Sequence, residues 1–306
     1  MTEVRIGISG WRYAPWRGDF YPKGLAQKNE LHFASRAVRS IEINGSFYAL
    51  QTPQRYASWY ADTPDGFVFS VKAPRFITHV RRLREVETPV ANFFASGVLS
   101  LRDKLGPILW QFPPSFKFDA EQFEHFLSLL PQSTDSARET AQHCNAELRK
   151  PGYLDHDKKR PLRHAVEIRN KSFVDPAFVA LLRRYRVALV VADTAGKWPY
   201  AEDLTGDFVY MRLHGDAELY ASGYSEEALT RWQKRIEAWT QGREPADAKL
   251  ISEEQDQTRV SRDLYCYFDN DIKVRAPYDA RRLLEKLGLA EGLETVPGQE
   301  APHDSS

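Results

Sequence analysis

The chain has 306 residues, and its 42 Lys plus Arg balance 42 Asp plus Glu, so its formal net charge is zero. A neutral chain offers no overall field to nucleic acid or to an anionic membrane, so any anion site must be local. An apolar content of 42% and a charged content of 27% are typical of a globular protein with a buried core. Its two cysteines, Cys144 and Cys266, exclude a disulfide framework and a Cys-rich metal site.

The beginning of the chain and its cysteine usage bear on its location. The first residues, MTEVRIGISGW, enter a strand directly and lack the basic and then apolar leader of a signal peptide. No apolar run approaches the ~20 residues that a membrane helix needs. We therefore expect a cytoplasmic protein with no membrane partner; the sequence does not indicate an oligomeric state.

Short apolar runs alternate with helical patterns along the chain, which is typical of βα units on a parallel sheet. About eight units fit this length, the number that closes a barrel. The predicted fold class is therefore α/β, with a single (β/α)8 TIM-like barrel over residues 1–290. The expected strands are residues 4–9, 40–44, 67–72, 108–112, 164–169, 187–193, 208–215 and 264–268.

Helices are expected between these strands, with Asp119 as an N-cap and the last helix beginning after Pro277. Polar insertions are expected after strand 4, at about 132–161, and before strand 8, at about 241–263. The first stretch has too few apolar residues to hold a core of its own. The polar, Pro-containing composition of residues 291–306 predicts a disordered tail.

Polar side chains gather at the carboxyl ends of the predicted strands, where such barrels place their sites. In residues 208–215, Arg212 and His214 share one face of the strand, while Met211 and Leu213 share the other. We expect the same parity in the other strands. These strand ends and the loops after them contribute Glu42, Asn44, Tyr48, Ser70, Lys72, His79, Gln111, Glu167, Arg169, Asp193 and Asp269 or Asn270.

These residue types suggest roles in catalysis and binding. Glu167 in a low-dielectric pocket could act as a general base or acid, and His214 could shuttle protons near neutral pH. Glu42 and Asp193 are the other catalytic candidates. Arginine offers forked donors and lysine a point charge to a phosphate or carboxylate. The candidates for binding substrate are Lys72, Arg169, Arg212, Asn44, Tyr48, Gln111, His79, Trp11 and Asn270.

The same charges have a purely structural alternative, because buried charges normally pair with one another. In that interpretation three cations and three carboxylates at the strand ends cancel and plug the mouth of the barrel. The aromatic residues of the loops after strands 1, 2 and 6 likewise either stack on a sugar ring or base or simply cover the mouth. Trp110 is out of phase with Gln111 and is expected in the core.

No cofactor is predicted. Two arginines beside the candidate carboxylates would repel a cation, and no HExxH spacing is present. A divalent metal is therefore only the less favoured alternative, on four side chains of suitable type, Glu167, Asp193, His214 and Asp269.

Several motifs occur in order along the chain, among them IGISGWRYAPW, IEINGSFYAL, LGPILWQFPPSF, AVEIRNKSF, VYMRLHG and YCYFDND. With these motifs the chain resembles the YecE-like family, domain-of-unknown-function family 72. The resemblance implies a TIM-like barrel, with distant kinship to sugar isomerases and endonuclease-type barrels, and it implies no established activity. Residues 273–277 depart from the family's expected small turn after strand 8. The candidates that match family positions are Glu42, Asn44, Tyr48, Lys72, His79, Gln111, Glu167, Arg169, Asp193, Arg212 and His214.

Three functions remain open from the sequence. The leading hypothesis is an enzyme that acts on a small anionic, sugar-like or phosphorylated ligand without an obligatory metal. The second is a protein that binds or processes nucleic acid, with loop aromatics gripping a strand or a flipped base. The third is a non-catalytic binding protein whose polar insertions contact a partner.

Overall fold

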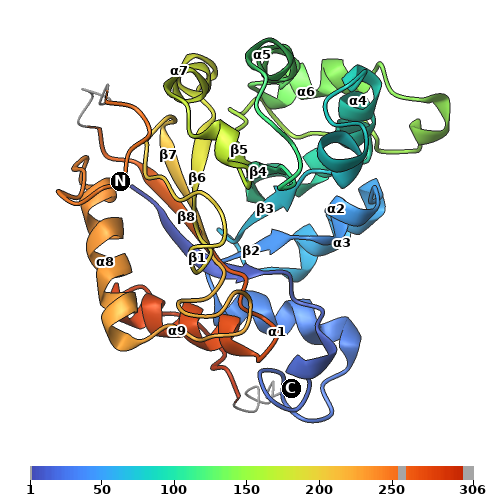
Figure 1. Cartoon of the computed structure of the whole chain (residues 1–306). Helices are drawn as coiled ribbons and strands as arrows, with labels where there is room; N and C mark the ends of the chain where they lie inside the picture. The colour runs from blue at the N-terminus through green and yellow to red at the C-terminus, as the bar shows by residue number, and fades with distance from the viewer. Residues whose placement is uncertain (1, 254–259, 299–306) are drawn as a thin grey trace.

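Eight parallel strands close into a barrel in chain order in the computed structural model, which describes residues 2–253 and 260–298 (Figure 1). The predicted (β/α)8 TIM-like fold is confirmed, and every expected strand overlaps an observed one. The strands are β1 Val4–Ser9, β2 Ser40–Ile43, β3 Val68–Lys72, β4 Leu105–Gln111, β5 His164–Glu167, β6 Ala188–Asp193, β7 Phe208–Leu213 and β8 Asp263–Phe268.

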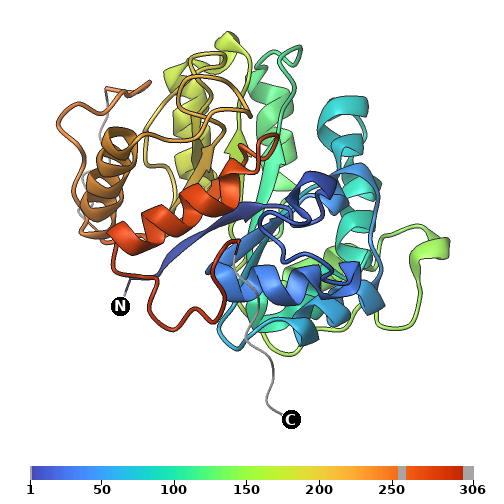
Figure 2. The same cartoon turned by 90° about the horizontal axis from the view of Figure 1, so that it is seen from below.

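Helices surround the barrel on the outside (Figures 1 and 2). α9 lies against β1, so the last helix covers the seam where β1 and β8 pair and the barrel closes. The helices are α1 Glu30–Ala37, the short α2 Gly45–Tyr48, α3 Pro53–Asp62, α4 Glu87–Ala95, α5 Ala120–Ser128, α6 Thr134–Ala141, α7 Pro176–Tyr185, α8 Glu226–Thr240 and α9 Arg275–Lys286.

Two helix starts test the sequence signals. The Asp119 side chain accepts a hydrogen bond from the backbone N–H of Gln122 at 2.9 Å, which confirms it as the N-cap of α5. The predicted start of the last helix is wrong, because α9 begins at Arg275 instead of after Pro277. Pro277 is tolerated there because the first N–H groups of a helix have no intrahelical partner.

Strand parity sorts the side chains into two layers. Outward residues such as Ile41, Val166 and Met211 are fully buried beneath the helices. Inward residues such as Leu109 and Tyr210 fill the barrel interior. Polar inward residues such as Glu42, Lys72 and Glu167 lie at the carboxyl end of this packed interior.

The polar stretches pack against the barrel in the described residues. α6 lies within the expected insertion 132–161 and packs against α4, with Ala137 and Ala141 fully buried. In the expected insertion 241–263, the backbone N–H groups of Ile251 and Ser252 donate to the carboxylate of Asp203, which lies before the insertion, at 2.7 and 3.0 Å. Residues 254–259 lie outside the described residues.

The disorder predicted from residue 291 is wrong for residues 291–298, which lie against the barrel. Thr295 is buried, and its hydroxyl donates to the carbonyl of Phe33 at 3.1 Å. The backbone N–H of Glu294 donates to the carbonyl of Arg36 at 3.1 Å. Composition misled here because a polar segment can be held by backbone hydrogen bonds to a fixed surface. Residues 299–306 lie outside the described residues.

Candidate functional site

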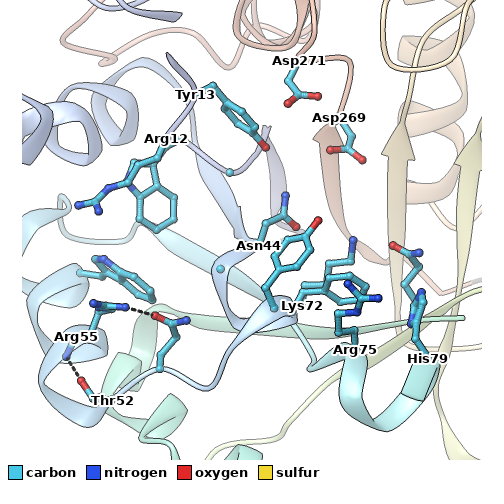
Figure 3. A pocket seen from close by; sticks show the side chains of 18 of the residues that line it. Arg12, Tyr13, Asn44, Thr52, Arg55, Lys72, Arg75, His79, Asp269 and Asp271 are labelled. Atoms are coloured by element: carbon cyan, nitrogen blue, oxygen red, sulfur yellow. Dashed lines mark hydrogen bonds between the residues drawn. The ribbon is translucent and has the colours of Figure 1, made fainter. Parts of the chain in front are cut away.

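A cavity of about 1110 Å³ opens at the carboxyl ends of the strands. It is lined from the β1, β2, β3, β4, β5 and β8 ends and by α3, in the place where such barrels carry their sites. Figure 3 shows Arg12, Thr52 and Arg55 on one side of it and Lys72, Arg75 and His79 on another, with Tyr13, Asp269 and Asp271 on a third.

Beneath the cavity, Arg212 on β7 is fully buried and binds three carboxylates. Its Nη1 donates to Glu167 at 2.6 Å, and its Nη2 donates to Glu42 and Asp269, each at 2.9 Å. Its Nε donates to the second oxygen of Glu42 at 3.1 Å, which makes that pair bidentate. Burial by itself would lower the pKa of Arg212, but these carboxylates raise it well above its usual range.

Both carboxylate oxygens of Glu42 are already occupied by protein donors. Ser9 donates to one oxygen at 2.6 Å, and Tyr210 donates to the other at 2.7 Å, in addition to the two bonds from Arg212. Glu42 is 0% exposed and does not line the cavity. A carboxylate with this many fixed donors positions its neighbours, and it has no access to a ligand in the cavity.

Glu167 and Asp269 are held as anions by the same network. Burial would raise the pKa of Glu167, but Arg169 and Arg212 hold it well below its usual range. Arg169 donates to Glu167 at 2.8 Å from the cavity side. Burial also opposes ionisation of Asp269, yet Arg212 and His214 hold its pKa far below the ordinary value.

His214 is fully buried behind Asp269. Its Nδ1 lies 3.0 Å from the Asp269 carboxylate, and its Nε2 lies 3.5 Å from Nη1 of Arg212. It does not line the cavity, but two residues that it contacts, Asp269 and Tyr220, do.

Lys72 differs from every cation in this network. It ends β3, is 8% exposed and lines the cavity, and its Nζ makes no hydrogen bond or ion pair within the described residues. Its Nζ lies 4.3 Å from the ring centre of Phe47. Burial and the charge of Arg212 lower the pKa of Lys72 to about 8, and nearby carboxylates such as Glu42 and Asp269 offset this only in part.

Two further titratable groups face the cavity. Burial and the neighbouring Asp269 raise the pKa of Asp271 to about 6. Burial and the charge of Lys72 lower the pKa of His79 to about 4, so its imidazole is neutral near pH 7. Asp271 thus changes charge near neutrality, which is what general acid–base chemistry requires.

Two predicted site residues do not reach the site. Asp193 pairs in register with Leu213 of β7, so its side chain points out of the barrel, where it accepts from Tyr224 at 3.1 Å. Asn270 is fully buried and donates to Asp279 of α9 at 2.9 Å, while its neighbour Asp269 turns toward the cavity. Both residues were predicted to face the site because they are polar and lie at strand ends. In these two strands, however, the outward row of side chains also ends in a polar residue.

The remaining candidates divide into two layers. Glu42, Glu167, Arg212 and His214 form the buried network and do not line the cavity, which fits the structural alternative for these four. The other candidates line the cavity itself: Trp11, Asn44, Tyr48, Lys72, His79, Gln111 and Arg169.

Several residues of the site were missed from the sequence. Ser9 shares the inward parity of β1, between the outward Ile8 and the turn at Gly10, and that pattern could have found it. Arg75 and Tyr220 lie in loops, where no periodicity signals a direction. Only the folded chain places them on this cavity.

The structure also bears on metal and membrane binding. Within residues 2–253 and 260–298, no three His, Cys, Asp or Glu side chains cluster in a way that could hold a metal ion. In the same residues, no helix combines the length and the apolar character needed to span a bilayer. Cys144 and Cys266 are both buried and free.

Comparisons with known proteins agree with the fold. A family described as "Protein of unknown function DUF72" matches residues 5–303. UPF0759 protein YunF of Bacillus subtilis is 31% identical over 121 residues, which cover 37% of this chain and 41% of YunF. UPF0759 protein YecE of Escherichia coli is 28% identical over 129 residues, which cover 42% of this chain and 44% of YecE. The chain thus aligns with less than half the length of these curated relatives.

Solved structures of DUF72 family proteins share the architecture. One from Thermotoga maritima superposes with a TM-score of 0.69 at 24% identity, covering 94% of this chain and 99% of that one. One from Enterococcus faecalis superposes with a TM-score of 0.62 at 16% identity, with the same coverage of 94% and 99%. At these identities the likeness supports the fold.

Proposed function

The chain belongs to the DUF72 family, whose description assigns no function, and we propose from its site that the protein is an enzyme acting on a small anionic, sugar-like or phosphorylated ligand. The ligand would occupy the cavity at the carboxyl end of the barrel. The observation that carries the proposal is Lys72, a buried cation that faces the cavity with no anion bound to it among the described residues.

The charge of the cavity wall supports an anionic ligand. Although the chain is neutral overall, the lining holds five cationic side chains against the carboxylates of Asp269 and Asp271. A desolvated ammonium gains most from a ligand anion because the local dielectric is low. The cationic side chains are Arg12, Arg55, Lys72, Arg75 and Arg169.

The rest of the wall suits a hydroxyl-bearing ligand. Asn44 and Gln111 offer amide groups, and Trp11 and Trp59 meet edge to face at 5.3 Å between ring centres. The indole N–H of Trp11 has no hydrogen-bond partner in the described structure. Aromatic faces beside unpaired polar groups are typical of sugar binding.

Chemistry on the ligand would fall to the groups that touch the cavity. Asp271, whose pKa is about 6, can give or take a proton near neutrality. Asp269 stays anionic and, with His214 behind it, can orient or stabilise a positive centre.

Calorimetry with inorganic phosphate, ribose 5-phosphate, glucose 6-phosphate and neutral ribose tests the proposal. Arg75 is exposed and makes no ion pair in the described residues, so Arg75→Gln should weaken phosphate-ester binding roughly 5- to 10-fold without loss of stability. Lys234→Gln, on the exposed face of α8, is the matched control and should change nothing. Equal binding by wild type, Arg75→Gln and Lys72→Met, or no heat with any compound, would refute the proposal.

Nucleic-acid binding is the second candidate, and exposed Tyr48 beside the cationic lining favours it, since an aromatic ring at a basic rim can stack on a base. A gel shift with a single-stranded oligonucleotide decides it. Binding should weaken steeply with salt if phosphates are contacted. No shift at low salt rules this function out.

A further inference from the structure

Lys72 has the surroundings of a nucleophile. It projects into the cavity from the end of β3, it is 8% exposed, and no carboxylate lies within ion-pair distance in the described residues (Figure 3). The other buried lysine, Lys104, donates to the carbonyls of Tyr60 and Thr63, each at 2.7 Å. An amine with all its donors engaged is inert, whereas one left unpaired in a partly apolar pocket can attack a ligand.

Burial and Arg212 shift Lys72 toward its neutral form. Arg212 from β7 repels its charge, and Glu42, Glu167 and Asp269 attract it from β2, β5 and the end of β8. These carboxylates are engaged by Arg212, so burial prevails and the pKa of Lys72 falls to about 8. At pH 7.4 roughly a fifth of this amine is uncharged, on the order of 100-fold more than for an ordinary lysine.

We propose that Lys72 forms an imine with the carbonyl carbon of an anionic aldehyde or ketone, such as an open-chain sugar phosphate or an α-keto acid. This inference rests on the anionic ligand of the proposed function and names its reactive group. Arg75 and Arg169 line the same cavity and would hold the anionic group, which leaves the carbonyl for Lys72.

The reaction balances without a co-reactant. The lone pair of neutral Nζ attacks the carbonyl carbon, a C–N bond forms, and the carbonyl oxygen takes up a proton. The resulting carbinolamine loses its N–H proton, its hydroxyl is protonated and leaves as water, and the C=N bond forms. No atom is oxidised or reduced.

Asp271 is suited to move these protons. It lines the cavity with Lys72, and its pKa of about 6 allows both protonation states near neutral pH. Asp269 remains anionic beside it and would stabilise the protonated imine. The protonated imine is an electron sink, so the class of reaction that follows is proton transfer or carbon–carbon bond cleavage next to the former carbonyl.

Borohydride trapping on the full chain tests the inference. The protein is incubated with ribose 5-phosphate, dihydroxyacetone phosphate, pyruvate or neutral dihydroxyacetone, and the imine is reduced to a stable secondary amine. We expect intact mass to rise by the mass of the compound less one oxygen atom, and peptide mapping to place the adduct on Lys72. The anionic compounds should label Lys72 at least about 10-fold faster than dihydroxyacetone.

Lys72→Arg keeps the charge but cannot form an imine, so it should retain binding in calorimetry and lose the adduct. Lys234→Gln should label as wild type does. Calorimetric binding without an adduct on Lys72, or adducts spread over surface lysines, would overturn the imine and leave the proposed function standing. Absence of both binding and adduct would overturn both. Mapping on the wild type decides the question even if a variant fails to fold.

Discussion

Arg212 and Lys72 are two buried cations at the mouth of one barrel, and they are treated in opposite ways. Arg212 donates hydrogen bonds to Glu42, Glu167 and Asp269, while Lys72 makes none within the described residues. A buried charge without a partner costs free energy, so a fold that keeps one must be stabilised elsewhere. The contrast separates a network that holds the barrel mouth together from a group that is kept for a ligand.

The largest effect is expected from Arg212→Met, because the substitution leaves three carboxylates, two of them fully buried, facing one another. The free energy of unfolding should fall by ~3–5 kcal/mol, the usual loss when one partner of a buried ion network is removed. Urea unfolding at pH 7 measures it. Arg231→Met, on a side chain that is 63% exposed, is the control and should stay within about 0.5 kcal/mol. A loss for Arg212→Met as small as that of the control would break the comparison.

His164 extends the comparison, because it is a buried imidazole whose hydrogen-bond partners are all uncharged. Trp110 donates to Nδ1 of His164 at 3.1 Å, and the carbonyl of Pro131 lies 2.8 Å from its Nε2. Burial lowers the pKa of His164 to about 4, below the ordinary value of ~6.5. Between these values the unfolded chain binds more protons, so the free energy of unfolding should fall as pH drops through this window, by up to ~3 kcal/mol at pH 4.

Urea titrations at pH 7, 6, 5 and 4 measure this slope. His164→Gln should make the slope shallower, while His79, whose pKa is also lowered to about 4, keeps its own part of it. His125→Gln, on a side chain that is 56% exposed, should leave the slope unchanged. A slope that is the same in wild type and His164→Gln would mean that another group binds the protons.

Substituting the two buried lysines with methionine should change the free energy of unfolding in opposite directions. Lys104→Met leaves the carbonyls of Tyr60 and Thr63 without their donor and should cost ~1–3 kcal/mol. Lys72→Met removes a desolvated charge that has no hydrogen bond, so it should raise the free energy of unfolding at pH 7 by ~1–3 kcal/mol while weakening ligand binding.

The gain from Lys72→Met should also depend on pH. The folded pKa of about 8 lies below that of an unfolded lysine, so the unfolded chain binds more protons between pH 8 and ~10.4, and wild-type stability should rise across that window. The variant's advantage in urea unfolding should therefore shrink as pH rises. Destabilisation by both methionine substitutions would show that Lys72 is paired after all.

The smallest effect is expected at the edge of the network. Ser9→Ala removes the hydroxyl that donates to Glu42 at 2.6 Å, but Glu42 keeps Arg212 and Tyr210. The free energy of unfolding should fall by about 1 kcal/mol. Ser128→Ala, on an exposed face of α5, is the matched control. A loss close to that of Arg212→Met would mean that Ser9 holds the network's geometry.

The barrel was predictable from the sequence because strand and helix periodicities are local and repeat eight times. The alternation of Arg212 and His214 with Met211 and Leu213 placed polar groups at the strand end, and β7 has that geometry. Asp119 and its apolar helix were likewise local signals. The failures arose where a packing partner decides the outcome: Asp193 turns to Tyr224, Asn270 turns to Asp279, and residues 291–298 are held by α1.

By itself the sequence determined the fold class, the strand ends and the residue types gathered there, because these follow from period and composition. Only the tertiary structure decided which of those side chains pair and which face a ligand. Glu42 and Lys72 are both charged residues with inward parity near the end of a strand. Arg212 donates to both oxygens of Glu42, whereas Lys72 faces the cavity. The physical reason is that pairing depends on ångström distances between strands far apart in sequence, and no local pattern encodes them.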